Sequence, residues 1–301
     1  MPPVKVPSCW KELVEDIHRV KGVVVILGAS DTGKTTLAFY LAGELLKRRN
    51  RVSIVSADVG QCAFGPPATI SMAMLEPGAK FLQEVPAHSM YFVGSTSPVG
   101  HFLQTVVGVK KQVERSLREG AEVVVVDTSG LVSGGAAWEL KSHKIELAGA
   151  RCVVAIQKER RELEDILLPL ERRGGIKLHR LPVSEHAKAR SYEQRREYRR
   201  QRYEEYFRDA GMKSLSLKDV SLVNPYDMAI QEGDSNTLRR RLVGLNDCDN
   251  FSIALGIIED VDLQGGTIRL ETPLRAARDD VGLIRLGSVV IEDGWYDRMV
   301  R

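Results

Sequence analysis

The sequence predicts an α/β fold in which a doubly wound, mainly parallel sheet is followed by a small β-rich C-terminal domain. Two unalternating apolar runs, at residues 22–27 and 123–126, are typical of central parallel strands that are covered on both faces. Strand-like runs alternate with helical patterns as far as residue 181, and such alternation puts helices on both sides of a sheet. The ligand site of this fold lies along the carboxyl ends of the strands.

The elements are expected in a regular order along the chain. The main series is strand 22–27, a helix from residue 36, strands 51–58 and 89–94, helix 101–119, strand 122–127, helix 136–148, strand 151–156, helix 159–170, strand 176–181 and a basic helix at 185–208. Runs at 251–258, 267–272 and 287–291 predict a mostly antiparallel domain. We therefore expect an amphipathic packing segment at 1–21, a main domain at 22–215 that includes the basic helix, and a β-rich domain at 220–301.

Composition narrows the class of protein. With 301 residues, of which 43% are hydrophobic, the chain can build cores for two domains. A net charge of +3 means that any nucleic-acid surface must come from clustered charges. We find no signal core and no apolar run long enough to span a bilayer, so a membrane function is not expected. The four cysteines are far apart without a C-x-x-C pair, which argues against a zinc site or a disulfide framework and favours the cytoplasm.

A glycine-rich turn follows the first strand and precedes a helix. Residues 28–35 match G-x-x-x-x-G-K-[ST], the phosphate-binding P-loop, in the required strand-turn-helix context. We expect Lys34 to reach the β- and γ-phosphates of a nucleoside triphosphate, and Thr35 to hold Mg²⁺. The alternative is a purely structural turn. The predicted nucleotide-binding residues are Gly28, Ala29, Ser30, Asp31, Thr32, Gly33, Lys34, Thr35 and Thr36.

Two acids end neighbouring strand-like runs. Asp127 closes a run of four valines and is expected to hold Mg²⁺ together with Thr35, the alternative being a helix cap. Asp58 is well placed to accept a proton from an attacking hydroxyl, the alternatives being a second metal ligand or a cap. Gln61 could orient that hydroxyl or a metal-bound water, or have no role. The P-loop and both acids predict a P-loop NTPase fold with its site at one sheet edge.

Two further patterns bear on the reaction. Residues 127–130 read D-x-x-G, as in GTPase switches, but a guanine-reading N-K-x-D is not found after the strand at 151–156, where residues 157–160 read Q-K-E-R. Guanine specificity therefore lacks its usual support. In the basic helix, seven of the fifteen residues at 188–202 are Lys or Arg, with tyrosines interleaved. Such a run is usually a solvated helix face.

Several segments together resemble the polynucleotide 5′-hydroxyl kinases. The segments are 28–36, 58–67, 92–98, 127–134 and 190–206, and D-x-G-Q followed by paired prolines is the most specific of them. That family includes the RNA kinase of eukaryotic mRNA 3′-end and tRNA processing, the nucleolar pre-rRNA kinase, and shorter archaeal and bacterial relatives. The resemblance covers about residues 20–210, and the β-rich tail also looks like the C-terminal domain of the shorter members.

The resemblance implies Mg²⁺-dependent transfer of the γ-phosphate of ATP, or of another nucleoside triphosphate, to the 5′-hydroxyl of single-stranded or end-exposed RNA or DNA, and a role in RNA processing. Asp58 matches the acid that is proposed to activate the 5′-hydroxyl in this family. Arg190 and Arg195 match lid arginines that close over the phosphates. Other arginines of the helix, Arg199, Arg200 and Arg202, are expected to face solvent or the nucleic-acid backbone. Substrate contacts are expected from Gln61, Ser97, Thr128 and Ser129, and no protein partner is indicated.

The chain departs from the family at Leu131. Eukaryotic members carry a tryptophan there, thought to clamp a substrate base, so stacking on a base is not available at this position. Trp138 could substitute for it or be a buried helix residue. Two other functions stay open: a GTPase or ATPase switch or assembly factor, and a catalytically weak RNA-binding relative of the kinases.

Overall fold

The computed structural model describes residues 7–76, 85–159, 161–223, 235–275 and 280–300. These residues form two compact units. The first holds the described residues up to 58, from 71 to 88 and from 106 to 190, and the second holds those at 59–70, 89–105 and 191–301. The remaining parts of the predicted segments, residues 1–6, 77–84, 160, 224–234, 276–279 and 301, lie outside the described residues.

The first unit is built on a mainly parallel sheet. Its strands are β1 (Gly22–Gly28), β2 (Val52–Ala57), β3 (Thr69–Leu75, of which residues from 71 on belong to this unit), β5 (Val123–Thr128), β6 (Ala150–Gln157) and β7 (Lys177–Pro182). The order is β3-β2-β5-β1-β6-β7, and each neighbouring pair is parallel except β2 with β3. The predicted parallel sheet is confirmed, and β3 is an antiparallel strand that the sequence analysis did not foresee.

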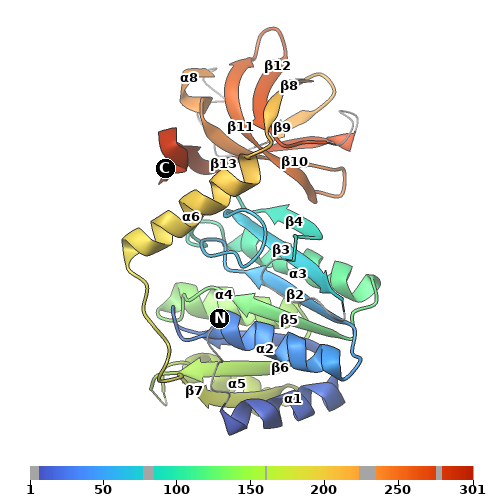
Figure 1. The fold of residues 1–301 in the computed structure, drawn as a ribbon, viewed down its shortest axis with the longest axis vertical. Coiled ribbons are helices and arrows are strands. Elements are labelled where there is room, and N and C mark those ends of the chain that lie inside the picture. Colours follow the sequence, from blue (N-terminus) through green and yellow to red (C-terminus); the bar gives the residue numbers. More distant parts are fainter. Residues whose placement is uncertain (1–6, 77–84, 160, 224–234, 276–279, 301) are drawn as a thin grey trace. The chain divides into compact units, whose positions relative to one another are not determined.

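Helices cover both faces of this sheet. They are α1 (Ser8–Val20), α2 (Lys34–Lys47), α3 (Phe102–Arg118, from 106 on in this unit), α4 (Gly135–Leu147) and α5 (Glu164–Arg173). Figure 1 shows α1 and α2 in front of the sheet and α4 and α5 behind it. The amphipathic pattern of α1 buries Trp10, Leu13, Val14 and Ile17, as expected for a packing helix. The doubly wound arrangement is therefore confirmed.

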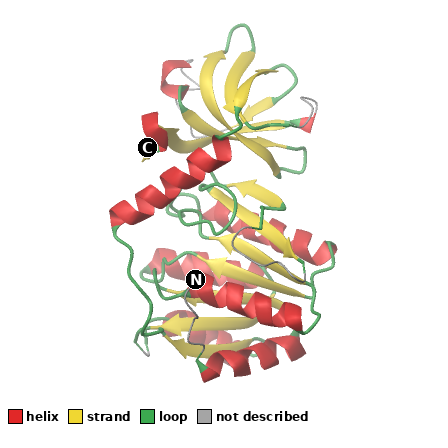
Figure 2. Ribbon diagram, in the orientation of Figure 1, coloured by secondary structure: helices red, strands yellow, loops and turns green. Residues whose placement is uncertain are grey.

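The second unit contains a strongly curved sheet (Figure 2). Its elements are β4 (Ser89–Phe92), α6 (Tyr192–Phe207), β8 (Gly211–Ser216), β9 (Ser221–Val223), α8 (Ser235–Leu238), β10 (Arg241–Asn246), β11 (Ser252–Asp262), β12 (Thr267–Thr272), β13 (Leu283–Ile291), η3 (Asp293–Trp295) and β14 (Asp297–Met299). The sheet order is β14-β13-β10-β11-β12-β8, all antiparallel, while β9 pairs in parallel with β13. The predicted β-rich C-terminal region is confirmed.

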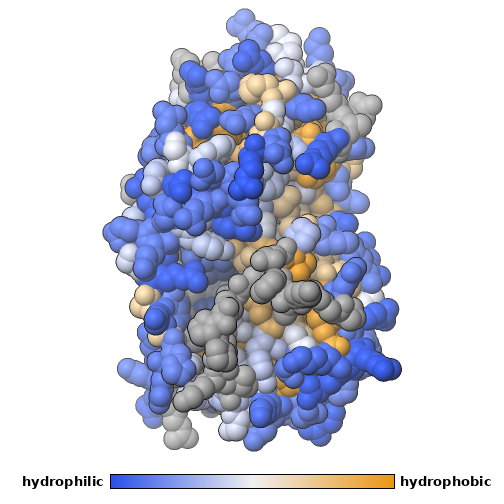
Figure 3. Space-filling view, in the orientation of Figure 1, coloured by the Kyte–Doolittle hydropathy of each residue, from blue (hydrophilic) through white to orange (hydrophobic). Residues whose placement is uncertain are grey.

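The basic helix α6 is packed within the second unit. It buries Tyr203 and Phe207 in a cluster with apolar residues of the curved sheet, among them Leu242, Leu255 and Val289. Its displayed surface is hydrophilic (Figure 3). The helix begins at Tyr192, later than the predicted start at 185, because Ser191 and Gln194 form a capping box.

The compact units divide the chain differently from the predicted domains. The predicted main domain, 22–215, includes α6, whereas the packing of α6 assigns it to the second unit. The segment at 1–21 packs through α1 as part of the first unit. Because compactness describes packing and not independent folding, the domain boundaries at 22–215 and 220–301 stay predictions.

Candidate active site

The glycine-rich turn closes tightly between β1 and α2. Thr32 Oγ1 donates a 2.9 Å hydrogen bond to the carbonyl of Ala29. A Cβ atom at Gly28 would lie 2.7 Å from that hydroxyl oxygen, which is too close for any side chain. Gly33 has a φ of 91°, a left-handed conformation that glycine adopts without strain, directly before α2 begins. The turn therefore has a curled backbone at a helix N-terminus, as a phosphate-binding loop requires.

The two residues that end the motif point to different partners. Lys34 Nζ donates a 2.6 Å hydrogen bond to the carbonyl of Ala29, so its ammonium lies over the loop. Thr35 Oγ1 donates a 2.6 Å hydrogen bond to Asp127 Oδ2 at the end of β5. The structure thus brings together Thr35 and Asp127, the two residues that were predicted to hold a metal ion.

Asp127 has one carboxylate oxygen available at this site. Its side chain is buried, and its Oδ1 atom has no hydrogen-bond partner among the described residues. Burial raises the pKa of Asp127 to about 6, against the charge of Lys34 and the hydrogen bond from Thr35. Mg²⁺ prefers hard oxygen ligands and is often held by one carboxylate and a hydroxyl. The oxygens of Asp127 and Thr35 therefore fit this ion.

Asp58 lies at the same edge of the sheet. It directly follows β2, the strand beside β5, and Ala57 is paired in register with Thr128. The carboxyl ends of these parallel strands therefore hold both predicted acids. Their carboxylates interact electrostatically: the charge of Asp58 adds to the effect of burial in raising the pKa of Asp127.

Two buried lysines on α4 were missed by the sequence analysis. Lys141 and Lys144 are 0% and 1% exposed. Lys141 Nζ donates to Thr128 Oγ1 at 2.8 Å and to the carbonyl of Ser129, and Lys144 Nζ donates to the carbonyl of Ala57 at 3.3 Å. Burial lowers the pKa of both, that of Lys144 to about 8. Their only sequence signal is a position on the buried stripe of α4, which also contains Ala137, Leu140 and Ile145.

The segment after Asp127 packs against the P-loop. A Cβ atom at Gly130 would lie 2.5 Å from the backbone nitrogen of Ser30, so a side chain larger than hydrogen would displace the loop. The buried hydroxyl of Ser129 has no hydrogen-bond partner among the described residues. The Thr128 hydroxyl donates to the carbonyl of Ile26 at 2.7 Å and accepts from Lys141. Of these two predicted substrate contacts, only Ser129 offers a hydroxyl without such internal bonds.

Three other predicted residues can be placed in the first unit. The backbone nitrogen of Arg190 donates to Asp31 Oδ2 of the P-loop at 3.0 Å. Leu131 is partly buried just beyond the loop-contacting Gly130. Trp138 is 42% exposed on α4. The expectation of a buried helix residue at Trp138 was therefore wrong, because the buried stripe of α4 lies on its neighbours at 137, 140 and 141.

The second unit holds Gln61 and Arg195 in contact. Gln61 Nε2 donates to the backbone carbonyl of Arg195 at 3.3 Å. Two later turns of α6 contact the same loop: Tyr198 donates its hydroxyl to the carbonyl of Cys62 at 2.7 Å, and Arg202 donates to the carbonyl of Gly65 at 2.9 Å. One face of the basic helix therefore fixes the loop at 59–67 that follows the predicted catalytic acid.

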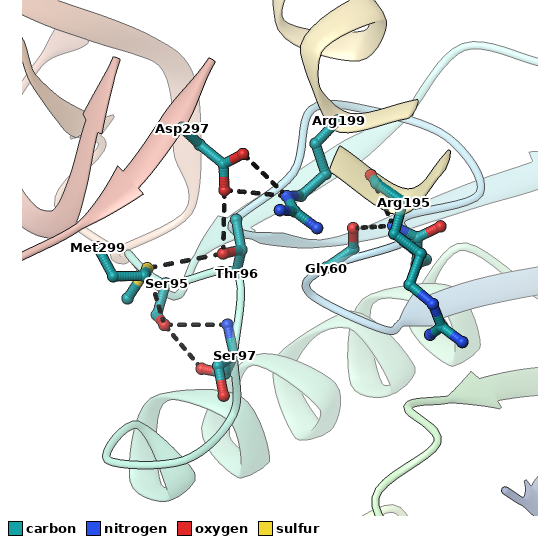
Figure 4. Close-up of polar contacts among 9 residues, drawn as sticks. Gly60, Ser95, Thr96, Ser97, Arg195, Arg199, Asp297 and Met299 are labelled. Carbon is teal, nitrogen blue, oxygen red and sulfur yellow. Dashed lines mark hydrogen bonds and ion pairs between the residues drawn. The ribbon is translucent and has the colours of Figure 1, made fainter. Parts of the chain in front are cut away.

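A buried ion pair fastens α6 to the last strand of its own unit (Figure 4). Arg199 Nε donates to both carboxylate oxygens of Asp297, at 3.0 and 2.9 Å, and Thr96 Oγ1 donates to the same carboxylate at 3.3 Å. The neighbouring Ser95 hydroxyl accepts a hydrogen bond from the backbone nitrogen of Ser97 and donates one to its carbonyl. Ser97 is a predicted substrate contact. Figure 4 shows the guanidinium of Arg195 extending away from the Arg199–Asp297 pair.

These contacts correct one expectation. Arg199, Arg200 and Arg202 were expected to face solvent or a nucleic-acid backbone. Instead, Arg199 pairs with the buried Asp297, and Arg202 contacts the loop carbonyl of Gly65. Arg200 pairs along its own helix with Glu197 and Glu204. For Arg199 and Arg202 the reason is that a carboxylate and a backbone carbonyl distant in the sequence reach α6. The partners of Arg200 are glutamates of the same helix.

Comparison with known families decides the membership of the chain. The family model described as mRNA cleavage and polyadenylation factor CLP1 P-loop matches residues 28–209, more than half of the sequence. The chain belongs to the CLP1 P-loop family. Membership confirms the predicted resemblance to the polynucleotide 5′-hydroxyl kinases and the P-loop fold. It also agrees with the geometry of the glycine-rich turn described above. Among the described residues of this CLP1-family chain, no helix is both long and apolar enough to cross a bilayer.

The relatives extend this similarity over most of the chain. This chain is 33% identical to a polyribonucleotide 5′-hydroxyl-kinase of Methanocaldococcus jannaschii over 326 aligned residues. The alignment covers 92% of this chain and 87% of that protein. The corresponding enzyme of Pyrococcus horikoshii is 38% identical over 345 residues, covering 96% and 92%. A structure of Clp1p in complex with Pcf11p superposes with a TM-score of 0.72 at 16% identity, covering 96% of this chain and 80% of that one, which shows a shared fold.

Proposed function

We propose that this chain is an ATP-dependent polynucleotide 5′-hydroxyl kinase. It transfers the γ-phosphate of ATP, or of another nucleoside triphosphate, to the 5′-hydroxyl of single-stranded or end-exposed RNA or DNA. The observation that carries the proposal is the meeting of Thr35 with Asp127 at the P-loop, with Asp58 on the adjacent strand end. A second acid beside a triphosphate cradle is what transfer to an alcohol needs. The names of the archaeal relatives support the same activity.

On the donor side, the chain binds and orients the triphosphate. The P-loop amides and Lys34 hold the phosphates. Thr35 and Asp127 would hold Mg²⁺, which supplies positive charge to the phosphate oxygens when bound. Arg190 and Arg195 neutralise the transferring phosphoryl group as lid residues.

On the acceptor side, Asp58 accepts the proton of the 5′-hydroxyl. The O5′–Pγ bond forms while the bond between Pγ and the β,γ-bridging oxygen breaks, so that the nucleoside diphosphate leaves. Gln61 orients the hydroxyl, and Ser97 and Ser129 contribute contacts to the nucleic acid. Thr128, whose hydroxyl bonds to Ile26 and Lys141, fixes the end of β5. We also propose a location in the reducing cytoplasm, because the four cysteines are free thiols and two of them are buried.

A label-transfer assay tests the proposal. The wild-type chain, Lys34→Ala and Asp58→Asn are incubated with γ-labelled ATP, Mg²⁺ and 5′-hydroxyl RNA or DNA oligonucleotides. We expect label on the oligonucleotide with wild type, none with Lys34→Ala and a steep decrease with Asp58→Asn. The exposed Lys110→Ala serves as the matched control. Release of free phosphate without labelled oligonucleotide would instead identify a nucleotide-hydrolysing switch, and binding of oligonucleotide without either product would identify a binding module.

A further inference from the structure

The two lysines buried beneath the predicted catalytic edge need a physical explanation. Lys141 and Lys144 are both essentially inaccessible to solvent, one helical turn apart on α4. Burying an ammonium group costs several kcal/mol unless charges and hydrogen bonds compensate for it. An apolar side chain at either position would avoid that cost. Because neither ammonium group can touch a substrate from a fully buried position, their effect must act through the groups they bond.

Lys144 bonds the peptide unit that carries Asp58. Its Nζ donates to the carbonyl of Ala57, and that carbonyl belongs to the same planar unit as the backbone nitrogen of Asp58. Fixing the oxygen therefore fixes the orientation of the plane from which the Asp58 side chain extends. The charge of Asp58 also interacts favourably with the buried ammonium group.

Lys141 bonds the segment that contacts the P-loop. Its Nζ donates to the carbonyl of Ser129, which shares a planar peptide unit with Gly130. Gly130 is the residue that packs against the backbone of Ser30. The same ammonium group donates to Thr128 Oγ1, which in turn donates to the carbonyl of Ile26 in β1. Lys141 therefore links the end of β5 to β1, the strand that leads into the P-loop.

We propose that Lys144 and Lys141 are positioning residues with separate tasks: Lys144 sets the orientation of Asp58 for hydroxyl activation, and Lys141 holds the peptide at 129–130 against the nucleotide-binding loop. This inference rests on the proposed kinase function. Their charges also offset those of the two acids at this buried edge.

The two tasks predict opposite kinetic signatures in the full-length chain. With Lys144→Met, we expect kcat for oligonucleotide phosphorylation to decrease about 30-fold or more, since small displacements of a catalytic group cost up to about 100-fold. The Kd of MgATP, measured by calorimetry, should stay within about threefold. With Lys141→Met, we expect the Kd of MgATP to increase about tenfold, with a smaller effect on kcat. Lys144→Gln keeps an N–H donor, so we expect it to recover part of the kcat lost with methionine.

A second readout does not depend on activity. Hydrogen exchange of the nucleotide-free protein should accelerate at residues 57–60 in Lys144→Met and at residues 128–131 in Lys141→Met, with little change elsewhere. Ile145→Val, a buried substitution on the same helix, and Lys110→Met, the same type of change at an exposed position, are the controls. Both should keep wild-type kcat and Kd.

The outcomes separate this inference from the function on which it rests. Folded Lys144→Met with wild-type kcat would overturn the positioning roles alone. So would lysine variants in which kcat, Kd and thermal midpoint all change together, without the separate effects on kcat and Kd. If Lys144→Met does not fold, Lys144→Gln provides the same comparison. A wild-type chain that transfers no label would contradict the proposed function, and the inference would fall with it.

Discussion

The hydroxyl of Thr35 donates a 2.6 Å hydrogen bond to Asp127, joining the first turn of α2 to the end of β5 across 92 residues of sequence. This bond uses one oxygen of the carboxylate and leaves Oδ1 without a partner among the described residues. The two proposed metal ligands are thus held together by a hydrogen bond between them. The same edge holds Asp58 and the two buried lysines, whose charges interact with one another and with that of Asp127.

Replacing Asp127 with asparagine should remove the charge needed for the metal while keeping the size of the side chain. We expect oligonucleotide phosphorylation to decrease about 100-fold or more, as for the loss of a preorganised electrostatic contact. Steady-state kinetics over a Mg²⁺ titration checks this. Asp165→Asn, on the N-terminal turn of α5, is the matched control and should behave as wild type. Full activity in Asp127→Asn would exclude this carboxylate as a metal ligand.

Gly130→Ala should impair nucleotide binding without touching the nucleotide. The added Cβ would lie 2.2 Å from Ser30 Oγ and 2.5 Å from its backbone nitrogen, so the P-loop has to move. We expect the Kd of MgATP to increase about tenfold, equivalent to about 1.4 kcal/mol. Gly135→Ala, where the new methyl group meets no atom within 4 Å, should bind as wild type. Equal affinities for both variants would show that the contact does not shape the loop.

The buried Arg199–Asp297 pair should contribute strongly to the stability of the second unit. Removing one partner leaves an uncompensated buried charge, so Arg199→Met should lower the free energy of unfolding by about 3 kcal/mol. The exposed pair of Arg298 with Glu292 is the control, and Arg298→Met should cost less than about 1 kcal/mol. Urea denaturation followed by tryptophan fluorescence measures both. A similar small loss in the two variants would mean that the buried pair is not important for stability.

His101 should make the protein more sensitive to acid. Burial, and to a lesser degree the charge of Arg285, lowers the pKa of His101 below its ordinary value of 6.5. The unfolded chain therefore binds a proton at this site more readily than the folded chain, so acidification from pH 7 to pH 5 reduces stability through this residue. In His101→Gln, we expect a smaller decrease in the urea midpoint over that interval. An unchanged pH dependence would contradict the burial of a neutral imidazole.

The sequence allowed the P-loop and Asp127 to be predicted because local patterns determine them. A run of apolar residues without alternation indicates a central strand, and a motif at its end has a known backbone conformation. The antiparallel strand β3 was missed, since its sequence, T-I-S-M-A-M-L, is not an unbroken apolar run and no motif follows it. The capping box at Ser191 could have given the start of α6, as S-x-x-Q is readable in the sequence.

Buried lysines could not be predicted in the same way. A lysine on a helix is usually exposed, and only tertiary partners reveal that Lys141 and Lys144 lie beneath strand ends. The surroundings of the basic helix were misjudged for a similar reason. Asp297, which pairs with Arg199, is 98 residues away in the sequence. Charge clustering indicated a cationic surface but not which arginines are used in packing.

The position of the transferred phosphate is the decisive measurement. Oligonucleotides with a 5′-hydroxyl and a blocked 3′ end are incubated with the wild-type chain, Mg²⁺ and γ-labelled ATP, and the product is digested to nucleotides to locate the label. We predict label on the 5′-terminal nucleotide with wild type, a steep loss with Asp58→Asn and none with Lys34→Ala. Label that appears only as inorganic phosphate, in amounts that do not change when the oligonucleotide is added, would contradict a kinase.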